Sequence, residues 1–141
     1  MIGETLIKKY EGCKLTAYLC PMKVWTIGYG NTSYEDGSKI KEGDAITQDR
    51  AEELLSNYLE KNVYPVFDKL PKLNNSQKEA ICSLVYNWNM AGFLNSNLFI
   101  AIKANNYSEI IKQWDYGFKN NLLGLFKRRT EELYFFFKDI E

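Results

Sequence analysis

The sequence predicts an α+β fold in which a small N-terminal β-hairpin region packs beside a mainly helical body. Residues 14–31 are rich in β-branched and aromatic side chains and are interrupted by Pro21, a pattern typical of a hairpin. From residue 47 onward, apolar side chains recur at helical spacing behind polar capping residues. The 141 residues contain no repeat or linker, so we expect one domain over 1–141, with the hairpin region at about 14–40 and the helical body at about 47–141.

The first element is predicted to be an amphipathic helix over residues 2–11. Apolar side chains fall on one face of this segment and charged ones on the other, and Gly12 supplies a helix stop. Glu11 is therefore the last residue of the helix, where the helix dipole and the free carbonyl groups disfavour a negative charge. This position favours a protonated Glu11, which is the form that a general acid needs.

The register of the hairpin follows from the length of its turn. If residues 21–23 form the turn, Tyr18 lies opposite Thr26, and Cys20 and Thr26 are diagonal neighbours on one face of the sheet. A four-residue turn would move Thr26 to the other face. The three-residue turn is the one that gathers polar groups into a site.

Two glycines and a second turn complete the hairpin region. Gly28 and Gly30 indicate a bulge or a close approach of the backbone to another group. Residues 35–38 are predicted to form a second turn. The sequence supports one small sheet.

The rest of the chain is predicted to be helical. Thr47 caps a helix that continues towards Phe67, with Pro65 either kinking it or beginning a new turn. Residues 76–79 form a capping box that opens a helix running to Trp88. Later features are a break at Gly92, helices at 96–104 and 108–114, a loop at 117–121, and a last helix with Leu125, Leu133, Phe136 and Ile140 on one side.

The composition excludes several classes of function. The chain has no histidine, which removes the usual base of Ser-His-Asp and Cys-His sites and the commonest zinc ligand. Basic and acidic side chains number 18 each, so nothing in the charge favours nucleic-acid binding. No apolar run reaches the length of a membrane span, and the three cysteines lack metal-binding spacing. We expect no metal and no cofactor.

One segment carries most of the functional information. Glu11 is followed after eight residues by Cys20 and after five more by Thr26, within a Trp-Thr-Ile-Gly-Tyr-Gly stretch at 25–30. This pattern resembles the catalytic segment of phage-type lysozymes, the endolysins of glycoside hydrolase family 24, and is close in plan to that of T-even phages. Further matches in the same order are Gln77, Tyr86, Asn87 and residues 93–96, and then Leu123, Gly124, Leu125, Arg128, Arg129 and Glu132.

The resemblance implies a lysozyme-like fold and hydrolysis of the β-1,4 bond between N-acetylmuramic acid and N-acetylglucosamine in peptidoglycan. It implies that Glu11, Cys20 and Thr26 are catalytic and that Tyr86 and Asn87 line the substrate cleft. Cleavage of a glycoside needs an acid for the leaving oxygen and a second group that attacks or positions water. Glu11 is the candidate acid; the role of Cys20 stays open between the two alternatives.

Two residues depart from the commonest family pattern. Cys20 stands where many relatives carry Asp, and a neutral thiol cannot stabilise a cation as a carboxylate does. Asn31 stands where His is common, so a neutral contact replaces an ion pair. The alternatives to hydrolysis are a lytic transglycosylase acting on the same bond and a non-catalytic wall-binding module.

The remaining expectations concern partners and structural residues. The resemblance implies a monomer that binds peptidoglycan, neither binds nucleic acid nor inserts stably into a membrane, waits in the host cytoplasm, and reaches the periplasm and cell wall through a holin-type pore. Arg128 and Arg129 are expected to be structural and to pair with acids of the N-terminal region; the alternative is a contact that tunes Glu11. Cys13 and Cys82 are expected to be small buried residues.

Overall fold

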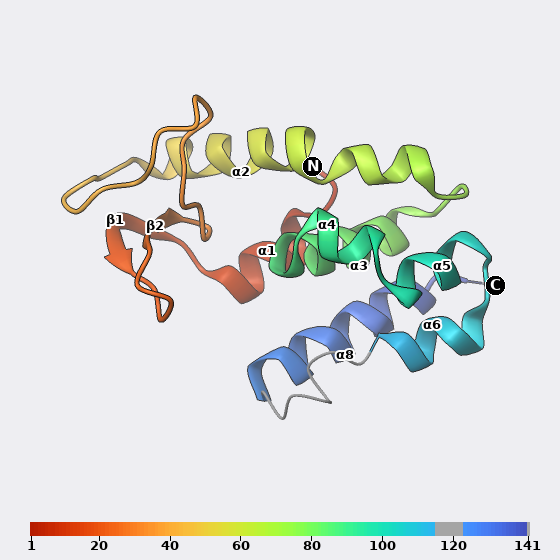
Figure 1. Cartoon of the computed structure of the whole chain (residues 1–141). Coiled ribbons are helices and arrows are strands. Elements are labelled where there is room, and N and C mark those ends of the chain that lie inside the picture. Colours follow the sequence, from red (N-terminus) through yellow and green to blue (C-terminus); the bar gives the residue numbers. More distant parts are fainter. Residues whose placement is uncertain (115–122, 141) are drawn as a thin grey trace.

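The structure, a computed structural model, describes residues 1–114 and 123–140. A two-stranded hairpin lies at one end, and most of the remaining described residues are helical (Figure 1). In chain order the elements are α1 (Glu4–Glu11), β1 (Lys14–Leu19), β2 (Trp25–Gly28), α2 (Gln48–Asn62), the 3-10 helix η1 (Tyr64–Lys69), α3 (Asn75–Trp88), α4 (Met90–Leu94), α5 (Asn97–Lys103), α6 (Tyr107–Gln113) and α8 (Leu123–Phe137). The α+β class predicted from the sequence is confirmed.

The hairpin has the register that the three-residue turn predicts. Strands β1 and β2 are antiparallel, with Tyr18 opposite Thr26 and Leu19 opposite Trp25. The amide of Lys23 donates to the carbonyl of Cys20 at 2.8 Å and closes the turn. Tyr18, Cys20 and Thr26 therefore lie on one face of the sheet.

Two apolar clusters hold the fold together, and α2 contributes to both. Its Leu54 packs with Ile27 and Ile40 beneath the hairpin region. Its Leu55 and Leu59 instead belong to the large core of the helical body. In that body α3 is central, since it packs against α1 on one side and α8 on the other (Figure 1).

The start of α3 differs from its prediction. The N-cap is Asn74 and not Ser76: the Asn74 side chain accepts from the Gln77 amide, and the Gln77 side chain accepts from the Asn74 amide. This capping box forms two residues before the predicted one. It satisfies the first free amides of the helix, so Ser76 and Glu79 are available for other contacts. The hydroxyl of Ser76 bonds to Asp139.

Two further boundaries were predicted with mixed success. The predicted break at Gly92 is wrong, because Gly92 lies within α4 and the chain breaks instead at Asn89, whose φ is 147°. Pro65 begins a new turn, as one of the two alternatives had it, and lies in the first turn of η1. The loop predicted at 117–121 lies outside the described residues.

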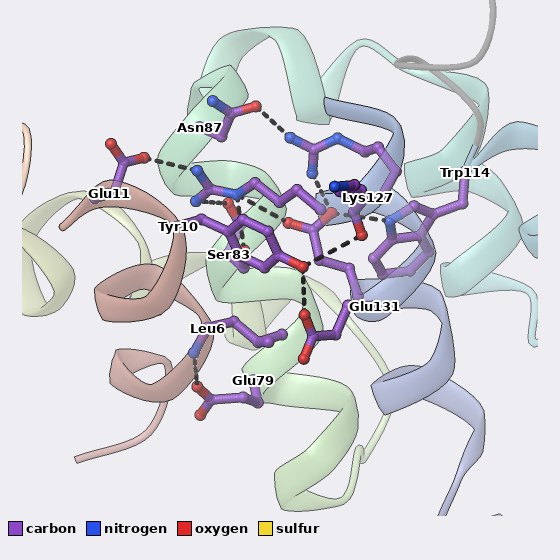
Figure 2. A network of polar contacts seen from close by, with 12 residues as sticks. Leu6, Tyr10, Glu11, Glu79, Ser83, Asn87, Trp114, Lys127 and Glu131 are labelled. Atoms are coloured by element: carbon purple, nitrogen blue, oxygen red, sulfur yellow. Dashed lines mark hydrogen bonds and ion pairs between the residues drawn. The ribbon is translucent and has the colours of Figure 1, made fainter. Parts of the chain in front are cut away.

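Helix α1 is tied to α3 by the buried carboxylate of Glu79. One oxygen accepts from the amide of Leu6 at 3.0 Å (Figure 2), and the other accepts from the amide of Gly3 at 2.7 Å. Gly3 has φ 94°, and a Cβ there would lie 2.6 Å from the Cβ of Cys82, so the chain meets α3 closely at this point. The helix then ends at Gly12, as predicted. Both ends of α1 are thus fixed, and with them Glu11.

Candidate active site

Glu11 lies at the C-terminal end of α1 and faces both the helical body and the hairpin region. Its Oε1 accepts from Nη1 of Arg128 at 2.8 Å, and its side chain is 22% exposed (Figure 2). The backbone of Gly30 passes beside the other oxygen: a Cβ on Gly30 would lie 3.0 Å from Glu11 Oε2. Gly30 has φ 90°, a conformation that favours glycine. The close backbone approach predicted for this glycine is therefore an approach to Glu11.

Arg128 supplies the positive charge next to Glu11. Its guanidinium joins the last described helix to the first one, across 117 positions of sequence. The prediction that it pairs with an acid of the N-terminal region is confirmed. Arg129 does not: it binds Glu132 and Asn87 instead. The helix-end effect expected for Glu11 from the sequence did not take account of this arginine.

The hairpin face carries Cys20 and Thr26. The backbone amide of Val24 lowers the pKa of the Cys20 thiol; burial opposes this, and the Met22 amide and the Thr26 hydroxyl lower the pKa further. The Thr26 hydroxyl has one proton, which it donates at 2.9 Å to the Val24 carbonyl. When Cys20 is ionised, the same proton can turn to the sulfur. The turn therefore makes the Cys20 thiol more acidic than an ordinary cysteine, at an accessible position.

Tyr18 connects the hairpin face with Glu11. Burial raises the pKa of Tyr18, and the negative charges of Glu11 and Cys20 raise it further. Glu11 and Cys20 therefore both lie within electrostatic range of this phenol. Tyr18 was not among the residues predicted for the site, although the hairpin register had placed it on the face of Cys20 and Thr26.

A groove adjoins Glu11 and runs between residues 30–37 and α2. Its volume is about 520 Å³, and the residues that line it include Gly30, Tyr34, Asn57, Tyr58 and Tyr86. The hydroxyl of Tyr86 donates to the carbonyl of Tyr29 at 2.6 Å, which fixes the segment that carries Gly30. Of the two predicted cleft residues, Tyr86 reaches this groove, whereas Asn87 has its side-chain oxygen turned to Arg129 (Figure 2).

Three other predicted residues have clear places. Asn31 is 5% exposed and lies beside the groove, with its side-chain oxygen near Gly28. Cys82 is buried, as predicted; Cys13 is only half-buried, because its sulfur lies at the surface near Gln48. In the described residues, no cluster of three or more cysteines and carboxylates is placed to hold a metal ion. No helix in the same residues has the length and apolar character of a membrane span.

Comparison with known proteins fits this geometry. A family model described as "Phage lysozyme" matches residues 8–132, which includes Glu11, the hairpin, the groove and Arg128. The chain belongs to the phage lysozyme family. It is 38% identical over 141 residues to the endolysin of Acyrthosiphon pisum secondary endosymbiont phage 1, across 92% of this chain and 91% of that protein.

Two solved structures are similar over nearly the whole chain. The endolysin from Escherichia coli O157:H7 phage FAHEc1 has a TM-score of 0.86 at 26% identity, covering 98% of this chain and 92% of that one. The muramidase domain of SpmX from Asticaccaulis excentricus has a TM-score of 0.79 at 26% identity, covering 96% and 94%. This phage lysozyme is thus an enzyme, a hydrolase that degrades peptidoglycan in phage lysis, and its lysozyme-like fold is confirmed.

Proposed function

We propose that this phage lysozyme hydrolyses the β-1,4 bond between N-acetylmuramic acid and N-acetylglucosamine, as a member of glycoside hydrolase family 24 built on the T-even plan. The observation that supports the proposal is the position of Glu11 at the end of α1, beside Arg128 and Gly30, with Cys20 and Thr26 on one face of the hairpin that follows. Such cleavage needs an acid on one side of the sugar bond and an electron-rich group on the other. The adjoining groove between residues 30–37 and α2, of about 520 Å³, is the place proposed for neighbouring sugar rings.

Glu11 is the general acid in this scheme. A protonated Glu11 gives its proton to the leaving oxygen, and the carboxylate that results is stabilised by Arg128 at 2.8 Å. Gly30 leaves the second oxygen of Glu11 open towards the groove.

Cys20 and Thr26 act on the opposite side of the sugar. As a thiolate, Cys20 places a negative charge against the oxocarbenium-like transition state, where many relatives carry Asp. Thr26 keeps that sulfur in place through its hydroxyl. The thiolate either attacks the sugar carbon or holds the water that does so, and the anomer of the first product, read by NMR, distinguishes these two routes.

The test of Glu11 is the Glu11→Gln variant, assayed on purified peptidoglycan. We expect clearing to fall by at least about a hundredfold, the size typical for loss of a general acid. The control is Glu53→Gln, because Glu53 lies 60% exposed on the outer face of α2. Clearing by Glu11→Gln at the wild-type rate would refute the proposal.

The test of Cys20 compares two substitutions of similar size. If the thiolate charge matters, Cys20→Asp keeps activity within about tenfold, while Cys20→Ser loses about a hundredfold or more, because only Asp restores a negative charge. A fully active Cys20→Ser excludes a nucleophilic thiolate.

The nature of the product separates hydrolysis from its alternatives. Hydrolysis leaves reducing muramic ends, whereas a lytic transglycosylase leaves anhydro-muramic ends, and mass spectrometry of the released fragments tells them apart. Binding of peptidoglycan without clearing would indicate a wall-binding module.

We also propose that the monomer accumulates in the host cytoplasm and passes through a holin-type pore to the periplasm and cell wall. The endolysin relatives support a role in release of phage. Expression in a bacterium should cause lysis only when a pore-forming protein is co-expressed; lysis without one would contradict this route. Size-exclusion chromatography tests the monomer.

A further inference from the structure

The Arg128 guanidinium is held from four sides. Its Nη1 donates to Glu11, its Nη2 donates to the carbonyl of Ser83 at 3.1 Å, and its Nε donates to the Ser83 hydroxyl at 3.1 Å. Nε also lies 3.5 Å from Oε2 of Glu132, and the ring of Tyr10 packs 5.6 Å from the guanidinium carbon. With its nitrogens engaged and its side chain 5% exposed, Arg128 has one orientation, and it points Nη1 at Glu11.

Glu132 is the buried acid behind this arginine. Its side chain is fully buried, one turn along α8 from Arg128. Its Oε1 accepts from Nε1 of Trp114 at 3.2 Å and from Nη1 of Arg129, whose other end donates to Asn87 (Figure 2). One carboxylate therefore serves two guanidinium groups.

Two acids among the described residues lie against the charge of Arg128. Arginine stays protonated in proteins, and burial of an uncompensated charge is strongly unfavourable. Glu132 lies at the buried Nε side of Arg128, and Glu11 lies at its Nη1 end, where the helical body meets the groove, so the two carboxyl groups share one guanidinium.

We propose that Glu132 is a positioning residue of the active site, which acts on Glu11 through Arg128. By sharing the charge of Arg128 from 3.5 Å away, Glu132 limits how strongly the guanidinium stabilises the Glu11 carboxylate. Glu11 can then keep the proton that the leaving oxygen requires. This inference rests on the proposed role of Glu11 as general acid.

Of the residues that the structure describes, Glu11 and Glu132 are the two acids that lie against the Arg128 guanidinium. Burial raises the pKa of Tyr10 to about 12 and raises those of Tyr18 and Tyr86, so these three phenols stay neutral at working pH. Glu131 is paired with Lys9. The titratable and charged groups around the pair are Tyr10 from α1, Tyr18 from the hairpin, Tyr86 from α3, and Arg129, Glu131 and Glu132 from α8.

The experiment is the pH–activity profile of Glu132→Gln, which keeps the shape of the side chain and removes its charge. Arg128 then acts on Glu11 alone, so the carboxylate form of Glu11 persists to lower pH. We expect the midpoint of the alkaline limb to move down by about half a unit to one unit, less than the effect of a directly contacting charge. This midpoint, unlike the height of the profile, does not depend on the folded fraction.

Two further variants make the result specific. Glu79→Gln removes another buried carboxylate of α3 that does not contact Arg128; it should destabilise the protein but leave the midpoint in place. Ser83→Ala removes the bond to Arg128 Nε without a change of charge, and should lower kcat severalfold with KM unchanged.

An alkaline midpoint in folded Glu132→Gln that superimposes on the wild-type one overturns the inference. If Glu132→Gln does not fold, a wild-type kcat in Ser83→Ala overturns it. If Glu11→Gln is inactive and either of these results is found, only the role of Glu132 is refuted. If Glu11→Gln is active, the proposed function itself is refuted.

Discussion

The contact between Glu79 and the start of α1 gives the sharpest prediction about stability. The carboxylate lies 9% exposed and binds two amides, those of Gly3 and Leu6, which have no partner within their own helix. It therefore works as an N-cap supplied by another helix, with a negative charge at the positive end of the α1 dipole. Replacement of Glu79 by Gln keeps one acceptor oxygen and loses the second acceptor and the charge.

The size of the effect follows from these two losses. A hydrogen bond to a charged group contributes about 1.5–3 kcal/mol, so Glu79→Gln should destabilise the protein by about 2.5 kcal/mol. The entropy of unfolding for a chain of this length is about 0.3 kcal/mol per kelvin, which converts the loss to a fall of about 8 °C in Tm. The Tm of Glu79→Ala should fall further, because this substitution leaves both amides without an acceptor.

Differential scanning calorimetry measures this change. The control is Glu60→Gln, because Glu60 is exposed on α2, and we expect its Tm to stay within about 1 °C of the wild-type value. If the Tm of Glu79→Gln falls by less than about 2 °C, the reasoning is refuted, because the two amides then find equally good partners elsewhere.

Three further predictions concern the site and its surroundings. Gly30→Ala places a methyl group against the active-site carboxylate and should lower clearing at least about tenfold, while the positive φ costs only about 1–2 kcal/mol of stability; equal clearing contradicts this. Cys20, whose pKa is lowered, should react with iodoacetamide at pH 7.5 well before Cys82, whose pKa burial raises; peptide mass spectrometry gives the order, and earlier labelling of Cys82 contradicts it. The arginine partner of Glu35 lowers the pKa of that carboxyl from 4.5 to about 2, so its stabilisation is complete above pH 4.5 and is lost as the pH falls towards 2. The Tm gap between the wild type and Glu35→Gln should therefore close on acidification, and a constant gap rules this out.

The features that could be predicted from the sequence are those fixed by short-range rules. The register of the hairpin follows from the length of its turn, and so the common face of Cys20 and Thr26 was predicted correctly. The caps at Thr47 and Ser96 follow from side chains that bond an amide three residues later.

The start of α3 shows where local rules are insufficient. Two overlapping capping boxes compete there, and the sequence does not rank them. The choice of Asn74 is explained by tertiary structure, because Glu79 is required at the start of α1, and Ser76 bonds to Asp139.

The arrangement around Arg128 was beyond sequence reasoning for a different reason. Glu11 and Arg128 lie 117 residues apart, and their contact depends on how α1 and α8 pack on the two sides of α3. The family motif pointed to Arg128 and Arg129 but did not distinguish them. The fold does so, since neighbouring residues on a helix point about 100° apart: one reaches Glu11, and the other faces inward to Asn87.

The double role of α2 has a consequence for how the molecule melts. Leu54 belongs to the apolar cluster of the hairpin region, and the next residue, Leu55, belongs to that of the helical body. If either cluster unfolds while this helix stays intact, one of the two leucines becomes exposed to water. The hairpin region is therefore not an independent cooperative unit, and heat should unfold it together with the body in a single calorimetric transition.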